Sequence, residues 1–366
     1  MKKYNKYPIL EVNTSYIRNN AQVMTEYCRK QGVSVAGVIK FSDGDLNIAR
    51  AYSQGGCAQI ASSRVIHLKG IKKRFPEIVT MLIRTPMLSE ANDVVRFCDI
   101  SLNTEREILK ALNHEAGSLG KKHKVILMLD VGDLREGIID ADELCTLAVF
   151  IECKLHNLYL MGIGSSFACF GSILPTKENL GTLISAARLI ENKINRKLEI
   201  ISGGSSVSLT LMQNEGLPEG INHLRIGGAI ANPRNIRINR GVVIDGINED
   251  TFVLKAELIE VNVKPSRPFG QSSINWAGNK VEFEDKGLRK RAIAAIGSQD
   301  IGDSMKLFPL DAGIKVIGCS SDHTILDIED SFRHWKAGDV VSFYLSYAPL
   351  LYSFCTKHVN IKYVKQ

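Results

Sequence analysis

The sequence predicts an α/β protein, in which a parallel (β/α)8 barrel is followed by a mostly β C-terminal domain. Eight short apolar runs alternate with helix-like segments over the first two thirds of the chain, and near Asp245 the pattern changes to strand-like runs alone. The 366 residues also exceed the roughly 250 of a typical barrel by about 120. We expect a barrel domain over residues 1–240 and a β domain over 241–366, with the first residues able to pack on the β domain.

The expected barrel strands are apolar or β-branched runs that stop at Gly, Ser, Asn, Asp or Pro. They are residues 33–40, 59–63, 81–86, 100–103, 124–131, 158–166, 198–204 and 224–230. Amphipathic segments such as TEREILKALNHEAGSLG and TKENLGTLISAARLIENKIN separate them, as helices separate the strands of a barrel. A doubly wound open sheet is the structural alternative, but it rarely needs eight such regular units.

The expected β domain consists of strand-like runs with Gly, Pro and Asp turns and little helical periodicity. The runs are residues 252–263, 289–297, 313–328, 339–351 and 359–364.

Composition excludes several classes of protein. With 45% hydrophobic and 23% charged residues the chain is typical of globular proteins, and no apolar run is long enough for a membrane span. The net charge of +7 comes from short basic clusters interspersed with acids, which indicates a solvated surface rather than a nucleic-acid partner. The eight cysteines show no CxxC or zinc spacing, so we expect no metal site and a reduced, cytoplasmic protein.

Polar or charged side chains mark the ends of the expected barrel strands, where barrel enzymes place their functional groups. They are Lys40, Ser63, Arg84, Asn103, Asp130, Arg135, Ser165, Ser166, Ser205, Ser206 and Arg225.

Lys40 closes the apolar run VAGVIK and would place an ammonium group at the mouth of the barrel. Most strand-end lysines simply reach solvent. A lysine that is partly desolvated in an enclosed mouth, however, has a lowered pKa and can act as a nucleophile that forms a Schiff base.

Two further elements point to an anionic ligand. IISGGSSVSL is a Gly/Ser loop after the seventh run, where barrel enzymes often bind phosphate, although such a loop is also a common turn. Arg225 lies inside the eighth run and needs an acceptor, which is either an internal salt bridge, for example with Asp130, or a ligand atom at the barrel mouth.

A Schiff-base lysine, a phosphate loop and an arginine in one barrel mouth describe a pyridoxal phosphate (PLP) site. The sequence resembles the alanine racemase family of fold type III PLP enzymes, most closely its ornithine racemase-like branch. The motifs that carry the resemblance include VAGVIK, DISLNTERE, ILMLDVGDLREG, LEIISGGSS, EGINHLRIG, GCSSDHTILD and LSYAPLL.

The resemblance implies roles for individual residues. Lys40 would form the Schiff base with the cofactor, Arg225 would meet the pyridine nitrogen, and Arg135 would help to orient the substrate carboxylate. The residues implied for the cofactor phosphate are Ser205, Ser206, Gly227, Gly228 and Tyr347. The resemblance also implies a head-to-tail C2 homodimer, in which the β domain completes the active site of the partner subunit.

Racemisation needs two acid/base groups that flank the substrate, of which Lys40 would be one. In alanine racemases the second is a tyrosine of the partner subunit, and the resemblance places Ser298 at that position. A serine is a poor proton shuttle without a base. The other candidates for the second group are His323, Cys319 and Asp322.

Further departures from the expected motifs indicate a changed substrate, a changed reaction or a decayed enzyme. Met128 stands where many of them carry a carbamylated lysine, and Ser166 stands where they carry a histidine. Ser205 stands where we expect an asparagine, and Phe170 where we expect a tyrosine in the ornithine racemase-like branch.

The sequence therefore favours a PLP-dependent racemase of another amino acid. The alternatives are another fold type III reaction, decarboxylation or retro-aldol cleavage, and a PLP-binding paralogue without catalysis.

Overall fold

The computed structural model describes residues 6–271, 273, 274, 278 and 280–364. Its contacts divide the chain into two compact units. The barrel unit is Thr14–Glu249, and the β unit combines the described residues up to Asn13 with those from Asp250 onward. Residues 241–249, which we expected in the second domain, group with the barrel in this division.

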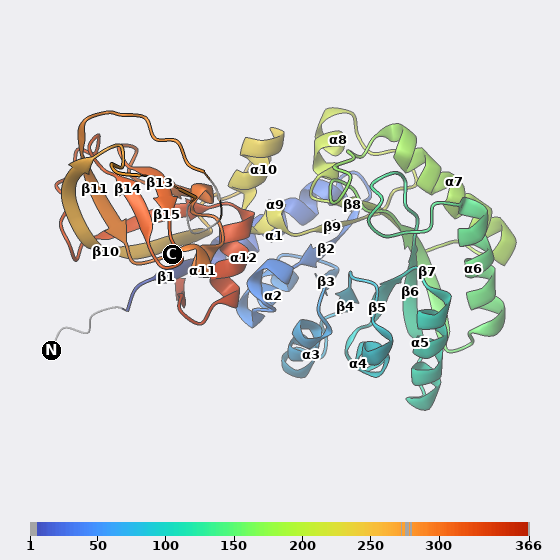
Figure 1. The fold of residues 1–366 in the computed structure, drawn as a ribbon. Coiled ribbons are helices and arrows are strands. Elements are labelled where there is room, and N and C mark those ends of the chain that lie inside the picture. The colour runs from blue at the N-terminus through green and yellow to red at the C-terminus, as the bar shows by residue number, and fades with distance from the viewer. Residues whose placement is uncertain (1–5, 272, 275–277, 279, 365–366) are drawn as a thin grey trace. The chain divides into compact units, whose positions relative to one another are not determined.

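The barrel unit contains a closed parallel barrel of eight strands, which confirms the predicted fold class (Figure 1). Each predicted run overlaps one strand, and the last strand pairs with the first. The strands are β2 (Ser34–Val38), β3 (Gln59–Ser62), β4 (Thr80–Leu82), β5 (Ile100–Asn103), β6 (His123–Met128), β7 (Leu158–Gly164), β8 (Ile200–Ser205) and β9 (His223–Ile226).

Helices alternate with these strands and lie on the outside of the barrel (Figure 1). They are α1 (Thr14–Arg29), α2 (Leu46–Gln54), α3 (Val65–Arg74), α4 (Ala91–Phe97), α5 (Arg106–Ser118), α6 (Ala141–Lys154), α7 (Lys177–Ile194), α8 (Ser208–Asn214), α9 (Gly228–Ala231) and α10 (Pro233–Arg240), with 3-10 turns η1 (Lys40–Ser42) and η2 (Leu88–Glu90). Local sequence explains their starts: the Asp140 side chain accepts the first free N–H groups of α6, and Thr176 does the same for α7.

The barrel interior is packed with side chains of medium size. Ala36, Met81, Ile126 and Met128 belong to one buried apolar cluster, to which every strand from β2 to β8 contributes. Met128, the last residue of β6, is fully buried in this cluster.

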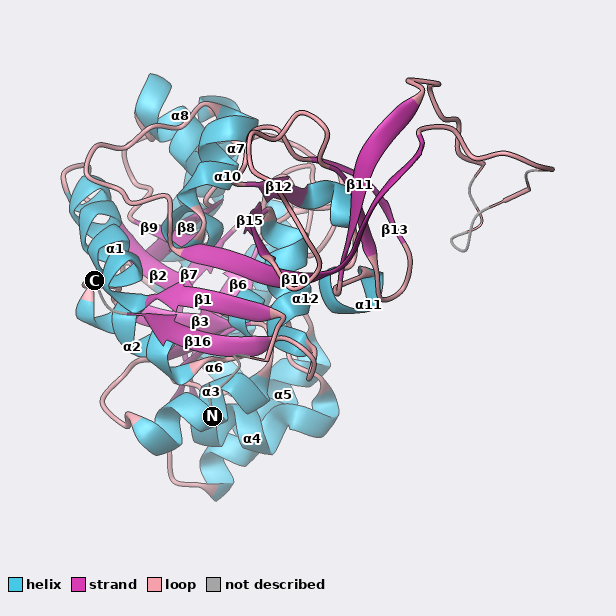
Figure 2. Cartoon of the chain, turned by 90° about the vertical axis from the view of Figure 1, so that its left-hand side faces the viewer, coloured by secondary structure: helices cyan, strands magenta, loops and turns pink. Residues whose placement is uncertain are grey.

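The β unit is an antiparallel sheet in the order β12-β15-β10-β11-β14-β13, which confirms the predicted β domain. Figure 2 shows β1 between β10, to which it is antiparallel, and β16, to which it is parallel. The elements are β1 (Ile9–Asn13), β10 (Phe252–Pro265), β11 (Leu288–Ala294), α11 (Ser298–Ile301), η3 (Ser304–Lys306), β12 (Leu307–Pro309), β13 (Lys315–Cys319), β14 (Thr324–Asp327), β15 (Val340–Leu345), α12 (Tyr347–Cys355) and β16 (Asn360–Val364).

One predicted strand is wrong in its second half. The run 339–351 forms a strand only to Leu345, and Tyr347 begins the helix α12. Ser346 occupies the N-cap position, and Pro349 lies in the first turn of the helix. Backbone N–H groups in the first turn have no intrahelical acceptor, so a proline there costs no helical hydrogen bond. Helical periodicity was hidden because this helix is apolar on most sides.

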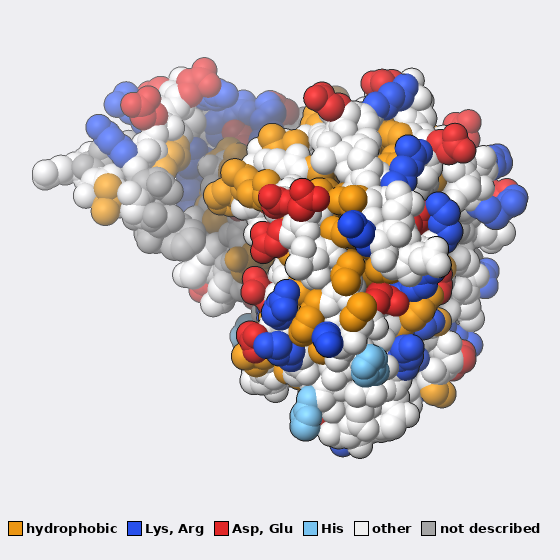
Figure 3. Space-filling view, turned by 90° about the vertical axis from the view of Figure 1, so that its right-hand side faces the viewer, with side chains coloured by type: hydrophobic (Ala, Val, Ile, Leu, Met, Phe, Trp, Pro, Cys, Tyr) orange, Lys and Arg blue, Asp and Glu red, His pale blue; other side chains and the backbone are white. Residues whose placement is uncertain are grey.

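The surface of the barrel unit carries both signs of charge, as the short basic clusters predict. Figure 3 shows basic and acidic side chains intermixed over one face. No helix among the described residues is long and apolar enough to cross a membrane. Cys28, Cys57, Cys98 and Cys145 are buried thiols, and the other four cysteines reach the surface at least in part.

Candidate active site

The candidate site lies at the carboxyl ends of the barrel strands, which meet at one face of a closed parallel barrel. Lys40 follows β2 as the first residue of η1, and Arg225 lies in the neighbouring strand β9. Ser165 and Ser166 follow β7, while Arg135 lies in the loop after β6. The fold therefore brings together side chains from distant parts of the sequence.

Lys40 is an exposed residue at the carboxyl end of the barrel, and its amine has cationic neighbours. Its ammonium group has no hydrogen bond or ion pair within the described part of the chain. Desolvation by the surrounding protein lowers its pKa below the ordinary 10.5, and the positive charges of Arg135 and Arg225 lower it further. A larger fraction of the amine is therefore unprotonated and nucleophilic.

Arg225 is buried, with 6% of its surface exposed, and neutral groups hold it. Its guanidinium donates to Ser202 Oγ at 2.5 Å, to the Ser165 carbonyl at 2.7 Å and to Ser166 Oγ at 3.4 Å. Burial lowers its pKa to about 10, so the group stays charged at neutral pH.

The internal salt bridge with Asp130 is not formed in the described chain. Asp130 Oδ1 instead accepts the N–H groups of Gly132 and Leu134, at 2.8 and 3.2 Å. Arg225 therefore keeps a positive charge that no carboxylate contacts directly, which suits a ligand acceptor atom.

Glu136 joins the two arginines of the site, and sequence reasoning missed it. Its carboxylate pairs with Arg135 and accepts the Ser166 hydroxyl at 2.8 Å, while Arg135 Nη2 donates to Ser166 Oγ at 2.9 Å. Because Ser166 also contacts Arg225, a continuous chain of contacts runs from Arg135 to Arg225. The only signal in the sequence was an acid placed directly after the arginine in a strand-end loop.

The predicted phosphate loop combines hydroxyl and amide groups from β8 and β9. Ser206 Oγ accepts the Ala229 N–H at 3.3 Å, which places Ser206 beside Gly227 and Gly228. Tyr52 donates its hydroxyl to the Gly227 carbonyl at 2.9 Å, and this fixes the peptide. Gly204 has φ +105°, and a Cβ there would lie 2.7 Å from the Phe167 ring, so the turn requires glycine.

Other predicted strand-end residues are committed to local structure. Arg84 pairs with Glu90 at 2.5 Å and donates to the Ser63 carbonyl at 3.1 Å. Asn103 is fully buried and donates to Ser101, although its Oδ1 has no partner among the described residues. The buried Ser165 Oγ, next to Arg225, likewise lacks one there.

The candidates for the second acid/base group gather in the β unit. Ser298 N donates to the Ser320 carbonyl at 3.0 Å, so α11 lies against the turn between β13 and β14 that carries Cys319, Asp322 and His323. His323 Nδ1 lies 2.8 Å from Asp322 Oδ1, and their side chains are 40% and 58% exposed. Tyr347 begins α12, and burial raises its pKa to about 12.

Comparison with known proteins identifies the family of the chain. The family profile described as "Alanine racemase, N-terminal domain" matches residues 12–232. The chain is 38% identical to an ornithine racemase of Acetoanaerobium sticklandii over 354 residues, which cover 97% of this chain and 99% of that protein. It is also 38% identical to a lysine racemase of Thermotoga maritima over 357 residues, or 98% of each chain.

Solved structures show the same fold at lower identity. An alanine racemase from Streptomyces lavendulae superposes with a TM-score of 0.75 at 16% identity, covering 99% of this chain and 98% of that one. A D-threonine aldolase from Filomicrobium marinum superposes with a TM-score of 0.71 at 13% identity, covering 95% and 89%. The fold alone therefore does not specify the reaction, whereas the two curated relatives are both racemases. This chain is an amino-acid racemase and belongs to the alanine racemase family.

Proposed function

We propose that the protein is a PLP-dependent racemase of an amino acid other than alanine, with ornithine and lysine as the first candidates. The observation that carries the proposal is Lys40, an amine of lowered pKa beside Arg135 and Arg225 at the carboxyl end of the barrel. The buried thiols Cys28, Cys57, Cys98 and Cys145 fit a cytoplasmic location.

The residues present fit the cofactor. Lys40 would hold it covalently, Arg225 would donate to its pyridine nitrogen, and the hydroxyl and amide groups near Ser206 would hold its phosphate. The residues proposed for the phosphate are Ser205, Ser206, Gly227 and Gly228, together with Tyr347 from the β unit. When bound, PLP supplies an electron sink that makes a Cα proton easier to remove.

Arg225 favours proton transfer over competing reactions. A guanidinium that stays charged at neutral pH donates a hydrogen bond to a ring nitrogen without transferring its proton completely, so the ring remains a moderate electron sink. This property argues against decarboxylation, for which a stronger sink would be useful.

Arg135 would bind the substrate carboxylate, held in place by Glu136 and Ser166. A guanidinium offers two parallel N–H donors to a carboxylate, and a fixed guanidinium loses less entropy when it binds. Glu136 also reduces the repulsion between Arg135 and Arg225, because it faces both positive charges.

Two acid/base groups would then exchange the proton on opposite faces of Cα. Lys40 would serve one face. For the other we propose His323, oriented by Asp322 and supplied by the partner subunit of a head-to-tail homodimer, with Cys319 and Ser298 as the remaining candidates. Imidazole suits the role because its ring nitrogens can both accept and donate a proton.

The test is to incubate the protein and PLP with single enantiomers of a panel of amino acids in deuterated water. We expect deuterium at Cα and formation of the opposite enantiomer, with ornithine or lysine as the best substrate. Exchange with none of the panel would overturn the proposal. Release of carbon dioxide or of an aldehyde without racemisation would establish one of the alternative reactions instead.

A further inference from the structure

Asp133 is a buried carboxylate that only backbone groups satisfy. It is 1% exposed, and no ion pair reaches it within the described ranges. Its two carboxylate oxygens accept the N–H groups of Cys169, Phe170 and Ile173 at 3.1–3.2 Å, and its carbonyl oxygen accepts the Gly171 N–H at 2.9 Å. The loop from β7 to α7 is therefore wrapped around one side chain of the loop from β6 to α6.

A charge is usually buried only with strong compensation. Here the compensation consists of several N–H dipoles that converge on the carboxylate, and they depend on one conformation of residues 168–173. A neutral side chain could not accept all of these bonds equally well. The carboxylate and the loop conformation therefore require each other.

Backbone strain is concentrated at the same place. The described chain has five non-glycine residues in the left-handed region, and Leu134, Ala168 and Ser172 are three of them. Leu134 directly follows Asp133. Ala168 and Ser172 directly precede Cys169 and Ile173, whose N–H groups donate to Asp133. Side-chain-bearing residues keep such angles when their surroundings hold them there, and they cluster at functional sites.

The two loops that Asp133 joins carry the residues of the candidate site. Arg135 lies two positions after Asp133, and Ser166 lies three positions before Cys169. The contacts of Ser166 with Arg135 and Glu136, at 2.9 and 2.8 Å, thus form between the two loops that Asp133 fastens together.

We propose that Asp133 is a positioning residue, which fastens the β7–α7 loop to the β6–α6 loop and so aligns Ser166 with Arg135 for binding of the substrate carboxylate. The substrate part of this inference rests on the proposed function, whereas the fastening of the loop does not. Asp133 contacts neither ligand and acts through the two loops.

The first test needs no substrate. Phe170 is 75% exposed and offers a chymotrypsin site within the fastened loop. In Asp133→Asn the amide group presents donors to N–H donors, so we expect cleavage after Phe170 in the PLP-free protein to become at least about tenfold faster. Mass spectrometry of the fragments locates the cut, and circular dichroism checks the fold.

The matched control is Asp140→Asn. Asp140 lies in the same β6–α6 connection and also accepts only backbone N–H groups, those of Asp142 and Glu143 at 2.7 and 3.1 Å. It caps α6 and does not touch the β7–α7 loop, so cleavage after Phe170 should stay at the wild-type rate. Asparagine is also a good N-cap residue.

Gly171→Ala tests the same contact from the other loop. A Cβ at Gly171 would lie 2.8 Å from the Asp133 carbonyl oxygen, so the substitution should also speed cleavage. If Asp133→Asn does not fold, this variant decides the question. Unchanged cleavage in Gly171→Ala, or in a folded Asp133→Asn, would overturn the fastening.

The second test uses PLP and the best amino acid of the panel. A misaligned Arg135 weakens substrate binding, so we expect KM to rise about tenfold in Asp133→Asn while the affinity for PLP changes less than about twofold. A loss of kcat with KM unchanged would overturn the positioning role. If the wild type racemises nothing, the proposed function fails while the proteolysis result still stands.

Discussion

Two strand arginines, one in each unit, are held in opposite ways. Arg225 in β9 donates to two serine hydroxyls and one carbonyl, and burial lowers its pKa. Arg289 in β11 donates to both oxygens of Asp327, at 2.9 and 3.1 Å, and hydrogen bonding to this carboxylate raises its pKa. The first arginine is buried without a directly contacting counter-ion, and the second has one.

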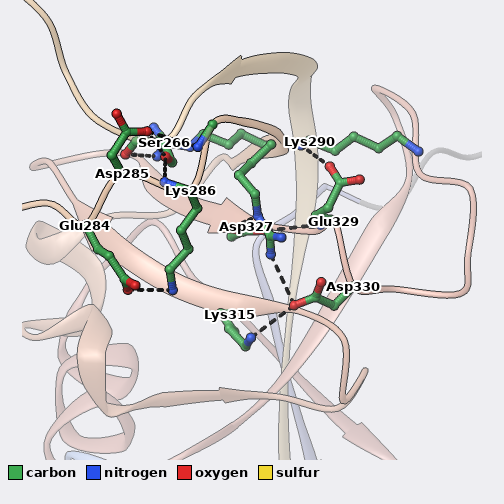
Figure 4. Close-up of polar contacts among 12 residues, drawn as sticks. Ser266, Glu284, Asp285, Lys286, Lys290, Lys315, Asp327, Glu329 and Asp330 are labelled. Carbon is green, nitrogen blue, oxygen red and sulfur yellow. Dashed lines mark hydrogen bonds and ion pairs between the residues drawn. The ribbon is translucent and has the colours of Figure 1, made fainter.

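The surroundings of Arg289 extend the difference. Asp330 accepts from Arg289 at 3.1 Å and from Lys315 at 3.0 Å, and Figure 4 shows these acids and bases side by side in the β unit. Arg289, Lys315, Asp327 and Asp330 each contact an opposite charge, so these ion pairs hold the strands together. An arginine that only neutral groups contact, by contrast, retains a charge for an anionic or electron-rich partner.

The largest effect is expected at Lys40, the amine beside Arg225. Lys40→Ala removes the only group we assign to covalent attachment, so racemisation should fall at least about a thousandfold, and the visible absorbance of bound PLP should disappear. Spectra and chiral chromatography measure both. Lys110→Ala, at a surface lysine paired with Glu107, is the control. A variant that kept both absorbance and activity would remove Lys40 from the site.

The next effect tests whether the exposed turn of the β unit joins the barrel chemistry. His323→Ala should slow racemisation about a hundredfold, because one of two acid/base groups is lost. Deuterium exchange at Cα should remain faster for one enantiomer than for the other, because Lys40 still removes the proton from its own face of Cα. His334→Ala, at an exposed histidine of the same unit, should change neither. If His323→Ala and His334→Ala slowed the reaction of both enantiomers equally, His323 would be excluded as the second acid/base group.

A direct comparison of the two arginines uses the same substitution in both. Arg225→Lys loses the forked donor geometry, so we expect kcat to fall about tenfold or more with little change in Tm. Arg289→Lys loses its paired contact with Asp327, so Tm should fall while kcat and KM stay the same. Kinetics and thermal unfolding of both variants measure the contrast. A fall in Tm without a fall in kcat for Arg225→Lys, together with a fall in kcat for Arg289→Lys, would contradict the assignment of Arg225 to the site and of Arg289 to stability.

The smallest effect is a shift in pH dependence. PLP is captured by the unprotonated Lys40 amine, so capture should become faster as the pH rises toward a pKa below 10.5. Arg135 is the charge that lowers this pKa most after burial itself, so Arg135→Gln should raise it and move the capture profile to higher pH. Arg84→Gln is the control at another strand end. A profile that moved to lower pH in Arg135→Gln would contradict the proposed electrostatics.

Much of the barrel could be predicted because its signals are local. Each apolar run that ended at a small or polar residue became a strand, and Lys40, Arg135 and Arg225 are placed at the end of the barrel that the strand order implies. The helix α12 was missed because an apolar helix and an apolar strand give the same short-range pattern, and only Ser346 and Pro349 marked the difference.

The contacts that complete the candidate site could not be predicted in this way. Glu136, Ser202 and Asp133 lie within the motifs ILMLDVGDLREG and LEIISGGSS, but the motifs do not show what these residues contact. Each is identified by a partner far away in the chain: Ser166, Arg225 and the 169–173 loop respectively. Hydrogen-bond partners depend on loop conformation and on distances of a few tenths of an ångström, which residue types do not encode singly.

By itself, the sequence determined the order of strands and helices, the family, and which lysine and arginines stand at strand ends, because periodicity and motifs are properties of neighbouring residues. Only the tertiary structure decided which acid faces which base. It left Arg225 among serines, paired Arg289 with Asp327, and enclosed Asp133 in backbone N–H groups. Closing the barrel brings those groups together, and burial then sets their charges and pKa values.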